Sequence, residues 1–165
     1  MKHTNKLLVE LVILFVFASI AFSFFYVAKV FVVDGTSMLP TLKNGERILV
    51  DKRAYIYVEP LKGDIVGLID PRDSSQQYVK RVVATSGDEL EINGNEVKVN
   101  GTPIYKISTY INDKKTVIPK GYYFVMGDNR NYSYDSRDFG LVPKTNILGK
   151  AVAVFWPVTK LRFIN

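Results

Sequence analysis

The sequence contains no cysteine and a single histidine, His3, among its 165 residues. The lack of cysteine excludes disulfides, thiolate zinc sites and a cysteine nucleophile. His3 precedes a long apolar run, so if that run crosses a membrane a Ser-His-Asp triad has no base on its far side. Metal-dependent hydrolysis is left with carboxylate-rich sites for hard ions. We therefore expect no metal and no cofactor.

Blocks of basic residues are also missing, although the net charge is +6. Nucleic-acid binding modules gather their lysines and arginines into patches with aromatic side chains between them, and here the basic residues are scattered. A scattered positive charge fits a protein that lies against anionic lipid. The composition, 47% hydrophobic and 23% charged, supports a packed core and argues against general disorder. A nucleic-acid partner is not expected.

One long apolar run is present, the uncharged stretch from Leu11 to Ala28. With the apolar residues around it, the run reaches the roughly 20 residues needed to span a bilayer. Lys2 and Lys6 precede it, so the positive-inside tendency puts the N-terminus in the cytoplasm. We expect a cytoplasmic tail (1–6), a transmembrane signal anchor (7–29) in the plasma or inner membrane, and an extracytoplasmic domain (30–165).

Two other interpretations of this run stay open. A cleavable signal peptide would use the small residues around Ser19-Ile20-Ala21, but the apolar run continues through Phe24 and Phe25, which favours an uncleaved anchor. A buried core helix is disfavoured because the segment is apolar around its whole circumference.

Sustained helical periodicity is absent after residue 30, where short β-branched and aromatic runs alternate with turn residues. The expected fold class is all-β, a barrel or sheet of short antiparallel strands behind one N-terminal helix. Asn44-Gly45, Asn93-Gly94 and Asn100-Gly101 are hairpin-type turn signals. A short hairpin or insert subdomain is expected over 92–118, and 106–120 as a mobile or inserted segment. Strands are expected at Val30–Asp34, Arg47–Asp51, Asp64–Ile69, Tyr78–Ala84, Glu89–Ile92, Glu96–Val99, Tyr122–Met126 and Leu148–Phe155.

With histidine and cysteine excluded, a serine nucleophile with a lysine base remains. A lysine must be neutral to accept a proton, and its ordinary pKa of about 10.4 has to fall by roughly two to three units, mainly through burial. The base should therefore lie on an apolar strand. Lys80, between Val79 and Val82, fits best, while Lys98 and Lys150 also lie in expected strands and stay open.

Four stretches, in order behind the apolar run, carry a resemblance to a known family: DGTSMLPTL, NGERILVDK, YVKRVVATSGDEL and YYFVMGDNRNYSYDSRDFGLV. They resemble the type I signal peptidases of bacteria, the Ser-Lys peptidases of family S26. The resemblance covers nearly all of the chain after residue 30 and implies a β-rich serine endopeptidase. Such an enzyme removes signal peptides from exported preproteins after small residues in an A-x-A-like pattern, with its site facing the lipid bilayer.

The resemblance assigns roles by position. Ser37 matches the nucleophile and Lys80 the general base, while Ser133 matches the serine that hydrogen-bonds and orients the lysine. Asp135 and Arg137 match a structural ion pair beneath the site. Gly35, Thr36 and Met38 fall at the oxyanion hole and substrate cleft. Turn and scaffold roles are expected for Gly127, Asp128 and Asn129.

An exposed apolar surface that touches lipid is expected from Met38, Leu39, Phe155 and Trp156. For Phe155, packing in the core is the alternative.

The sequence departs from the family pattern at two positions. Some members carry a serine where this chain has Gly35, so its oxyanion hole must use backbone N–H groups, as in the Gram-positive form. Ser86 replaces a proline that is frequent before the glycine of the third block, which should change a turn only.

Rival functions stay open on the sequence alone. One is another Ser-Lys peptidase, either an autoprotease resembling the SOS-repressor peptidases or a peptidase dedicated to one pilin-like client. A second is a tethered β-module that binds extended peptides without cutting them. A calcium site in Gly127–Asp138 is disfavoured because Arg130 and Arg137 lie among its carboxylates.

Overall fold

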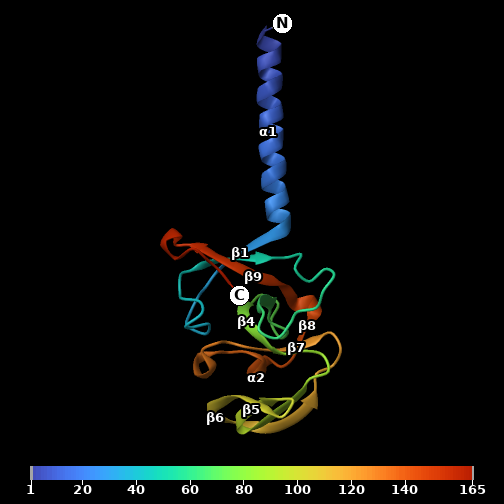
Figure 1. Cartoon of the computed structure of the whole chain (residues 1–165), viewed down its shortest axis with the longest axis vertical. Coiled ribbons are helices and arrows are strands. Elements are labelled where there is room, and N and C mark those ends of the chain that lie inside the picture. The colour runs from blue at the N-terminus through green and yellow to red at the C-terminus, as the bar shows by residue number, and fades with distance from the viewer. Residues whose placement is uncertain (1, 165) are drawn as a thin grey trace.

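The computed structural model describes residues 2–164, with the side chains of 2–5, 7, 8, 20–25, 95 and 106–114 left aside. A long helix, α1 (Lys2–Val27), stands away from a domain of strands, and β1 (Ala28–Val32) follows it with no loop between them (Figure 1). Among the described residues, no helix has both the length and the hydropathy of a membrane span. The side chains of His3 and Ala21 lie outside the described ones.

An eight-stranded sheet forms the body of the domain, in the order β1-β2-β9-β3-β4-β7-β8, with β10 added beside β9. Every neighbouring pair is antiparallel. Since three strands separate β1 from β4, these two run in the same direction. The further bounds are β2 (Arg47–Asp51), β3 (Ile65–Ile69), β4 (Gln77–Ala84), β7 (Tyr122–Met126), β8 (Val142–Pro143), β9 (Ile147–Trp156) and β10 (Arg162–Phe163).

A separate hairpin of β5 (Glu89–Val99) and β6 (Thr102–Val117) lies at the end of the domain farthest from α1 (Figure 1). Asn100 and Gly101 both have positive φ, 52° and 75°, as a two-residue hairpin turn requires. Opposite charges face each other across the strands: Glu91 is in register with Lys115, and Lys115 lies 2.8 Å from Glu89. Such cross-strand pairs favour this register.

Three apolar clusters make the core. The first packs β1, β2 and β9 against the loop that follows β1, through residues such as Phe31, Ile48 and Leu42. The second joins the β5–β6 hairpin to β7. The third packs β3, β4 and β7 against the short helix α2 (Ser136–Phe139) through Phe139. Within residues 2–164, three single-turn 3-10 helices complete the elements: Arg130–Tyr132, Lys144–Asn146 and Val158–Lys160.

The structure confirms a mostly antiparallel β fold, and the strands expected at Arg47–Asp51 and Tyr122–Met126 have the expected bounds. One turn expectation was wrong. Asn93-Gly94 is not a turn, because β5 continues through it with a register shift on either side of Gly94. The segment 106–120, expected to be mobile or inserted, belongs largely to β6, which pairs with β5.

Two smaller corrections concern the loop after β1. This strand ends at Val32 rather than Asp34, because the chain bends at Gly35, where φ is 87°. Asn44-Gly45 does not form a two-residue hairpin. Gly45 instead donates to the Val33 carbonyl at 2.8 Å and closes a long loop between β1 and β2.

Gly149 should be the least replaceable glycine of the sheet. A Cβ there would collide with the Asp51 carbonyl oxygen on β2. We expect Gly149→Ala to lower the free energy of unfolding by about 1–3 kcal/mol or more, because backbone cannot move aside as a side chain does. Urea unfolding followed by circular dichroism measures this loss. Gly121→Ala is the control, because Gly121 also has positive φ but no atom within 4 Å of the added Cβ. Equal losses would contradict the steric explanation.

Candidate active site

Ser37 lies on the loop between β1 and β2, and its neighbours hold it there. Met38 and Leu42 are buried at 2% and 0% exposure in the first core cluster. The Gly35 N–H donates to Asn44 Oδ1 at 2.8 Å, which ties the start of the loop to its end. Ser37 is therefore presented by a loop whose next residue is anchored in the core. Since Met38 is buried, it does not belong to an exposed lipid-facing surface.

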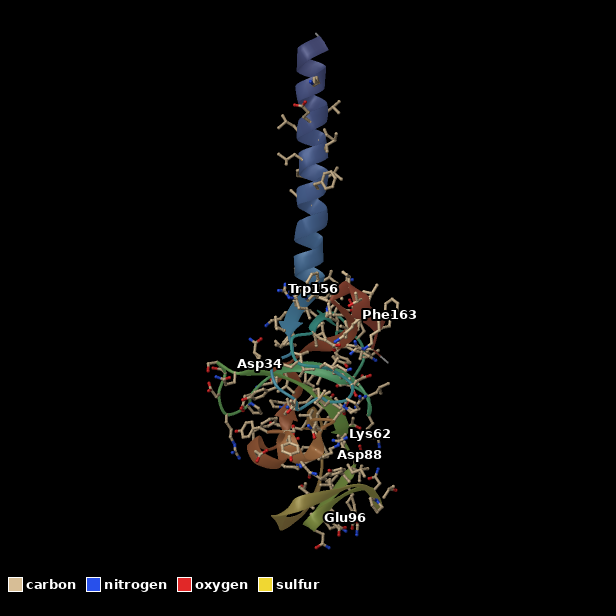
Figure 2. All side chains as sticks on the ribbon, turned by 90° about the vertical axis from the view of Figure 1, so that its left-hand side faces the viewer. Asp34, Lys62, Asp88, Glu96, Trp156 and Phe163 are labelled. Carbon is tan, nitrogen blue, oxygen red and sulfur yellow. The ribbon has the colours of Figure 1, made fainter. Side chains whose placement is uncertain are left out.

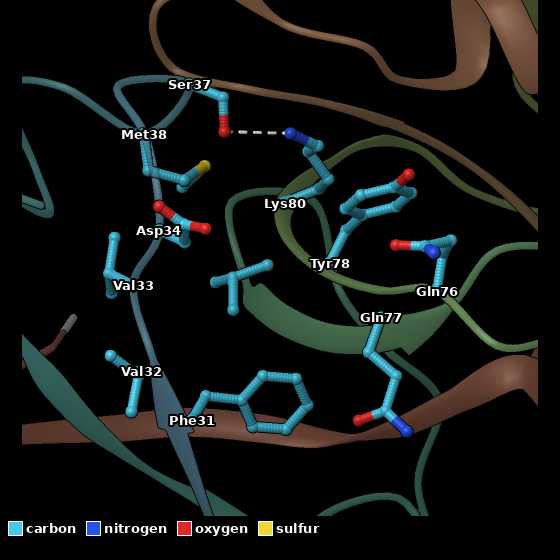
Figure 3. A pocket seen from close by; sticks show the side chains of 11 residues that line it. Phe31, Val32, Val33, Asp34, Ser37, Met38, Gln76, Gln77, Tyr78 and Lys80 are labelled. Carbon is cyan, nitrogen blue, oxygen red and sulfur yellow. Dashed lines mark hydrogen bonds between the residues drawn. The ribbon is translucent and has the colours of Figure 1, made fainter. Parts of the chain in front are cut away.

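Lys80 enters the same site from β4. Its side chain is only 3% exposed, and its Nζ lies 2.9 Å from Ser37 Oγ, a hydrogen bond across 43 residues of sequence (Figure 3). The ring of Tyr78, two residues earlier on the strand, has its centroid 5.5 Å from the amine. The other two strand lysines lie elsewhere: Lys98 pairs with Glu96, and Lys150 with Asp64. Of the three lysines left open by the sequence, Lys80 is the one beside the serine.

Burial lowers the pKa of Lys80 from 10.5 to about 8, because the charged amine loses the solvation of water. The carboxylates of Asp135 and Asp138 act in the opposite direction, and the Arg137 guanidinium adds to the lowering. A substantial fraction of this amine is thus uncharged at mildly alkaline pH. An uncharged amine has a lone pair that can accept the proton of the Ser37 hydroxyl.

The block that begins at Gly127 supports the Ser37 loop from behind. The Asn129 N–H donates to the Ser37 carbonyl at 2.9 Å, and its side-chain amide donates to the Thr36 carbonyl at 3.1 Å. A Cβ at Gly127 would lie 2.5 Å from the Ser37 carbonyl oxygen, so glycine allows this close approach. Asp128 accepts two hydrogen bonds from Arg81, at 2.8 and 2.7 Å, and one from Thr41 at 2.6 Å. These contacts fit the turn and scaffold roles expected of 127–129.

Asp135 and Arg137 form the expected ion pair, with Arg137 Nε and Nη2 each 2.8 Å from an Asp135 oxygen. Both side chains are buried, and Asp135 also accepts from the Gly127 N–H at 3.0 Å. Asp135 caps α2 as well, together with Asp138 in a reciprocal capping box. The pair therefore connects α2 to the backbone that supports Ser37.

Ser133 does not make the hydrogen bond expected of it. Its Oγ is buried and has no hydrogen-bond partner among the described residues, so it does not hold the Lys80 amine. It instead packs against Gly127, where an added Cβ would collide with it. The Lys80 amine is positioned by its own strand and by Ser37.

The backbone N–H groups near Ser37 differ in whether they are already hydrogen-bonded within the protein. The Gly35 N–H is already bound to Asn44 and is not free for an oxyanion. The Ser37 N–H makes no hydrogen bond to another described residue. Thr36 contributes its carbonyl, which accepts from Leu39 and Asn129. The Ser37 amide is accordingly not occupied by another described residue.

A cleft of about 210 Å³ runs from the dyad toward α1, between the end of β1 and the first half of β4. Each wall has an open edge: β1 pairs only with β2, and Gln77–Lys80 pair only with β3. At the helix end, Lys29 Nζ donates to Gln77 Oε1 at 2.8 Å and joins the two walls. The cleft is lined by Phe31, Val32, Val33, Asp34, Ser37, Met38, Gln76, Gln77, Tyr78, Val79 and Lys80 (Figure 3).

Sequence reasoning missed several of these residues. Asn129 was expected only as a scaffold residue, and nothing in its spacing showed that it would clamp two carbonyls of the nucleophile loop. Strand alternation places Tyr78 on the same face as Lys80, but it gave Tyr78 no role at the site. Lys29 and Gln77 gave no signal, since their contact depends on how the sheet curves. Of the lipid-facing candidates at the C-terminal end, Trp156 is 50% exposed and Phe155 is half-buried.

An antiparallel β domain that holds a serine against a buried lysine, at the end of a cleft with two open strand edges, is the arrangement of a serine peptidase. Comparison with known proteins agrees. The family model described as signal peptidase, peptidase S26, matches residues 5–156. The chain belongs to this family, and it is a serine peptidase, a hydrolase of signal peptide processing.

Similar proteins are found in several organisms. Signal peptidase I of Leptolyngbya laminosa is 35% identical over 150 residues, which cover 82% of this chain and 72% of that one. Signal peptidase IB of Staphylococcus aureus (strain MRSA252) is 34% identical over 160 residues, covering 84% and 83%. A crystal structure of a signal peptidase I from Enterococcus faecalis V583 is 28% identical, with a TM-score of 0.46, and the match covers 56% of this chain and 96% of that one.

The lowered pKa of Lys80 has a consequence for stability. The folded protein releases this proton near pH 8, whereas the unfolded chain keeps it to about 10.5. Between these values the unfolded state binds more protons, so stability rises with pH. Relative to Lys80→Met, the parent should gain up to about 3 kcal/mol in its free energy of unfolding across this window. Urea denaturation at a series of pH values measures the difference. If the difference in free energy of unfolding between the parent and Lys80→Met does not change with pH, the Lys80 amine titrates normally.

Proposed function

We propose that this protein is a membrane-bound signal peptidase I that cleaves exported preproteins with a Ser37/Lys80 dyad, after small residues in an A-x-A-like pattern. The observation that carries the proposal is the 2.9 Å hydrogen bond between Ser37 Oγ and the amine of Lys80, a side chain that is 3% exposed. A solvated lysine would be charged at neutral pH and could not accept a proton. Burial makes this amine usable as a base.

The proposed reaction uses this serine and lysine in two successive steps. Neutral Lys80 takes the Ser37 proton while Ser37 Oγ attacks the scissile carbonyl, which gives a tetrahedral oxyanion and a lysine ammonium. The Ser37 N–H stabilises the oxyanion, an effect worth about 3–4 kcal/mol for a well-aligned donor. The ammonium then protonates the leaving amine, and the acyl-enzyme forms. The mature protein leaves with the new amino terminus. Water then loses a proton to the same lysine and attacks the ester, which releases the cleaved signal peptide with a new carboxyl terminus, and the lysine ammonium returns a proton to Ser37 Oγ.

The two open strand edges suggest how the substrate binds. An extended peptide between β1 and β4 would receive main-chain hydrogen bonds from both walls. Since these strands run in the same direction, the peptide is parallel to both or antiparallel to both. The dyad lies at the far end of the walls from α1, so a signal peptide that arrives from the α1 side runs parallel to them. Apolar Phe31 and Val33 would leave room only for small side chains next to the scissile bond.

The proposed location is the plasma or inner membrane, with the tail 1–6 in the cytoplasm, the segment 7–29 as the anchor and 30–165 outside, including the insert 92–118. The support is the uncharged run Leu11–Ala28 and the lysines before it. Ser37 lies eight residues beyond Lys29, so at about 3.5 Å per residue it is within roughly 28 Å of the membrane boundary. Holding enzyme and substrate in one plane would raise their effective concentration.

Loss of either dyad residue should abolish cleavage. With detergent-solubilised full-length protein and a preprotein whose signal ends in Ala-x-Ala, we expect Ser37→Ala and Lys80→Arg each to lower kcat by at least about 10⁴-fold. The arginine keeps the positive charge but cannot lose its proton. In the parent, kcat/KM should rise with pH through an apparent pKa near 8, as Lys80 becomes neutral.

The matched control is Lys98→Ala, which removes a strand lysine from the distant hairpin and should leave kcat unchanged. Cleavage that survives Ser37→Ala or Lys80→Arg would eliminate the dyad. A parent that binds the preprotein without cutting it would favour a peptide-binding module instead.

The anchor proposal has its own test. The full-length protein should stay in the membrane pellet after alkaline carbonate extraction, because the proposed anchor, with its uncharged run Leu11–Ala28, would lie in the bilayer. Replacing Phe15 and Phe17 with lysine should release it into the supernatant, because each charge at the centre of a span costs about 2.5–3.5 kcal/mol. A parent found in the supernatant would refute the anchor and leave the dyad untouched.

A further inference from the structure

Asp34 is a charged residue of the cleft that the proposed chemistry does not use. It follows β1, lines the cleft near Ser37, and is exposed to solvent (Figures 2 and 3). It makes no hydrogen bond or ion pair to another described residue. Among the residues that line the cleft it is the one carboxylate, and Lys80, the one lysine there, is buried and uncharged when it acts as a base. Asp34 therefore dominates the charge at this part of the cleft.

The backbone at Asp34 belongs to the open edge of the wall. The N–H and C=O of Val33 are both bound on the β2 side, to Glu46 and Gly45 at 2.8 Å each. Successive residues of an extended chain direct their backbone groups to opposite sides. The backbone groups of Val32 and Asp34 consequently face the open side, where a peptide strand would lie. A bound substrate is thus the direct neighbour of Asp34.

Side-chain alternation decides which substrate residue meets Asp34. Phe31 and Val33 are buried, whereas Val32 and Asp34 point to the exposed face. A peptide strand added beside them alternates in the same way. If the small residues of an Ala-x-Ala signal enter the buried face, the middle residue x stands on the exposed face. Position x then shares a face with the carboxylate of Asp34.

We infer that Asp34 is a specificity-determining residue, which favours a basic side chain at position x of the substrate and disfavours an acidic one. The inference rests on the proposed function and adds a charge preference to it. Side chains on the same face of neighbouring strands interact, and opposite charges there are favourable while like charges are not. The contact is exposed, so it is a preference rather than an absolute requirement, and salt weakens it.

The test uses one preprotein in three forms, with Lys, Gln or Glu at position x, and the full-length enzyme in detergent at low salt. We expect kcat/KM to fall in the order Lys, Gln, Glu, by about two- to fivefold at each step. Asp34→Asn should make the three rates equal, and Asp34→Lys should reverse their order. Glu96→Gln is the control, because it removes one negative charge from the hairpin at the opposite end of the domain (Figure 2) and should leave the order unchanged.

The outcomes distinguish failure of the role of Asp34 from failure of the proposed peptidase function. Equal rates for the three substrates in the parent, or an order that persists in Asp34→Asn, would overturn the role of Asp34 while leaving the peptidase intact. If the variants are inactive, the order of the three rates in the parent and its loss at high salt still decide the question. A parent that cuts none of the substrates would overturn the proposed function, and the inference with it.

Discussion

The contact between Ser37 and Lys80 depends on keeping a lysine amine away from water. Such an amine is useful as a base only if nearby charges do not restore its proton. In this protein, the charged side chains around the site form ion pairs with one another. Arg81, on the opposite face of β4, is bound by Asp128, and Arg137 is bound by Asp135. Each pair has little net charge, so desolvation remains the largest influence on Lys80.

The carboxylates of these ion pairs also hold the backbone and side chains around Ser37 in place. Asp135 holds the Gly127 amide and caps α2, and Asp128 holds Thr41 within the nucleophile loop. Asn129 binds the carbonyls of Thr36 and Ser37, which lie on either side of the Ser37 Cα. A single stretch, 127–138, therefore shields the charges around Lys80 and fixes the position of Ser37. This double role explains why so many polar residues lie in a block that makes no chemical step of its own.

Much of the fold could be predicted because its strands carry β-branched residues between clear turns, and Arg47–Asp51 and Tyr122–Met126 were found with the right ends. The strand β6 was missed because it is rich in polar residues, and its pairing with β5 is visible only when both strands are present. The helix α2 is one turn long, too short for a periodic pattern, although its capping box, Asp135 and Asp138, is a readable signal.

For the site, elimination of histidine and cysteine led to a lysine base, and a strand setting favoured Lys80. The choice over Lys98 and Lys150 required the fold, because it depends on which strand faces the Ser37 loop. The hydrogen bond expected of Ser133 came from resemblance alone, and the structure does not contain it. Side-chain contacts of this kind depend on local packing, which a motif does not determine.

The helix α1 passes directly into the strand β1, which forms one wall of the cleft. The helix ends at Val27 and the wall of the cleft begins at Ala28, and the Val27 carbonyl accepts the Lys52 N–H from the end of β2 at 2.9 Å. No loop separates the helix from β1, and the Lys29–Gln77 hydrogen bond connects β1 to β4 two residues after the helix ends. The same short stretch of chain therefore ends the helix, begins one wall of the cleft and ties it to the other wall.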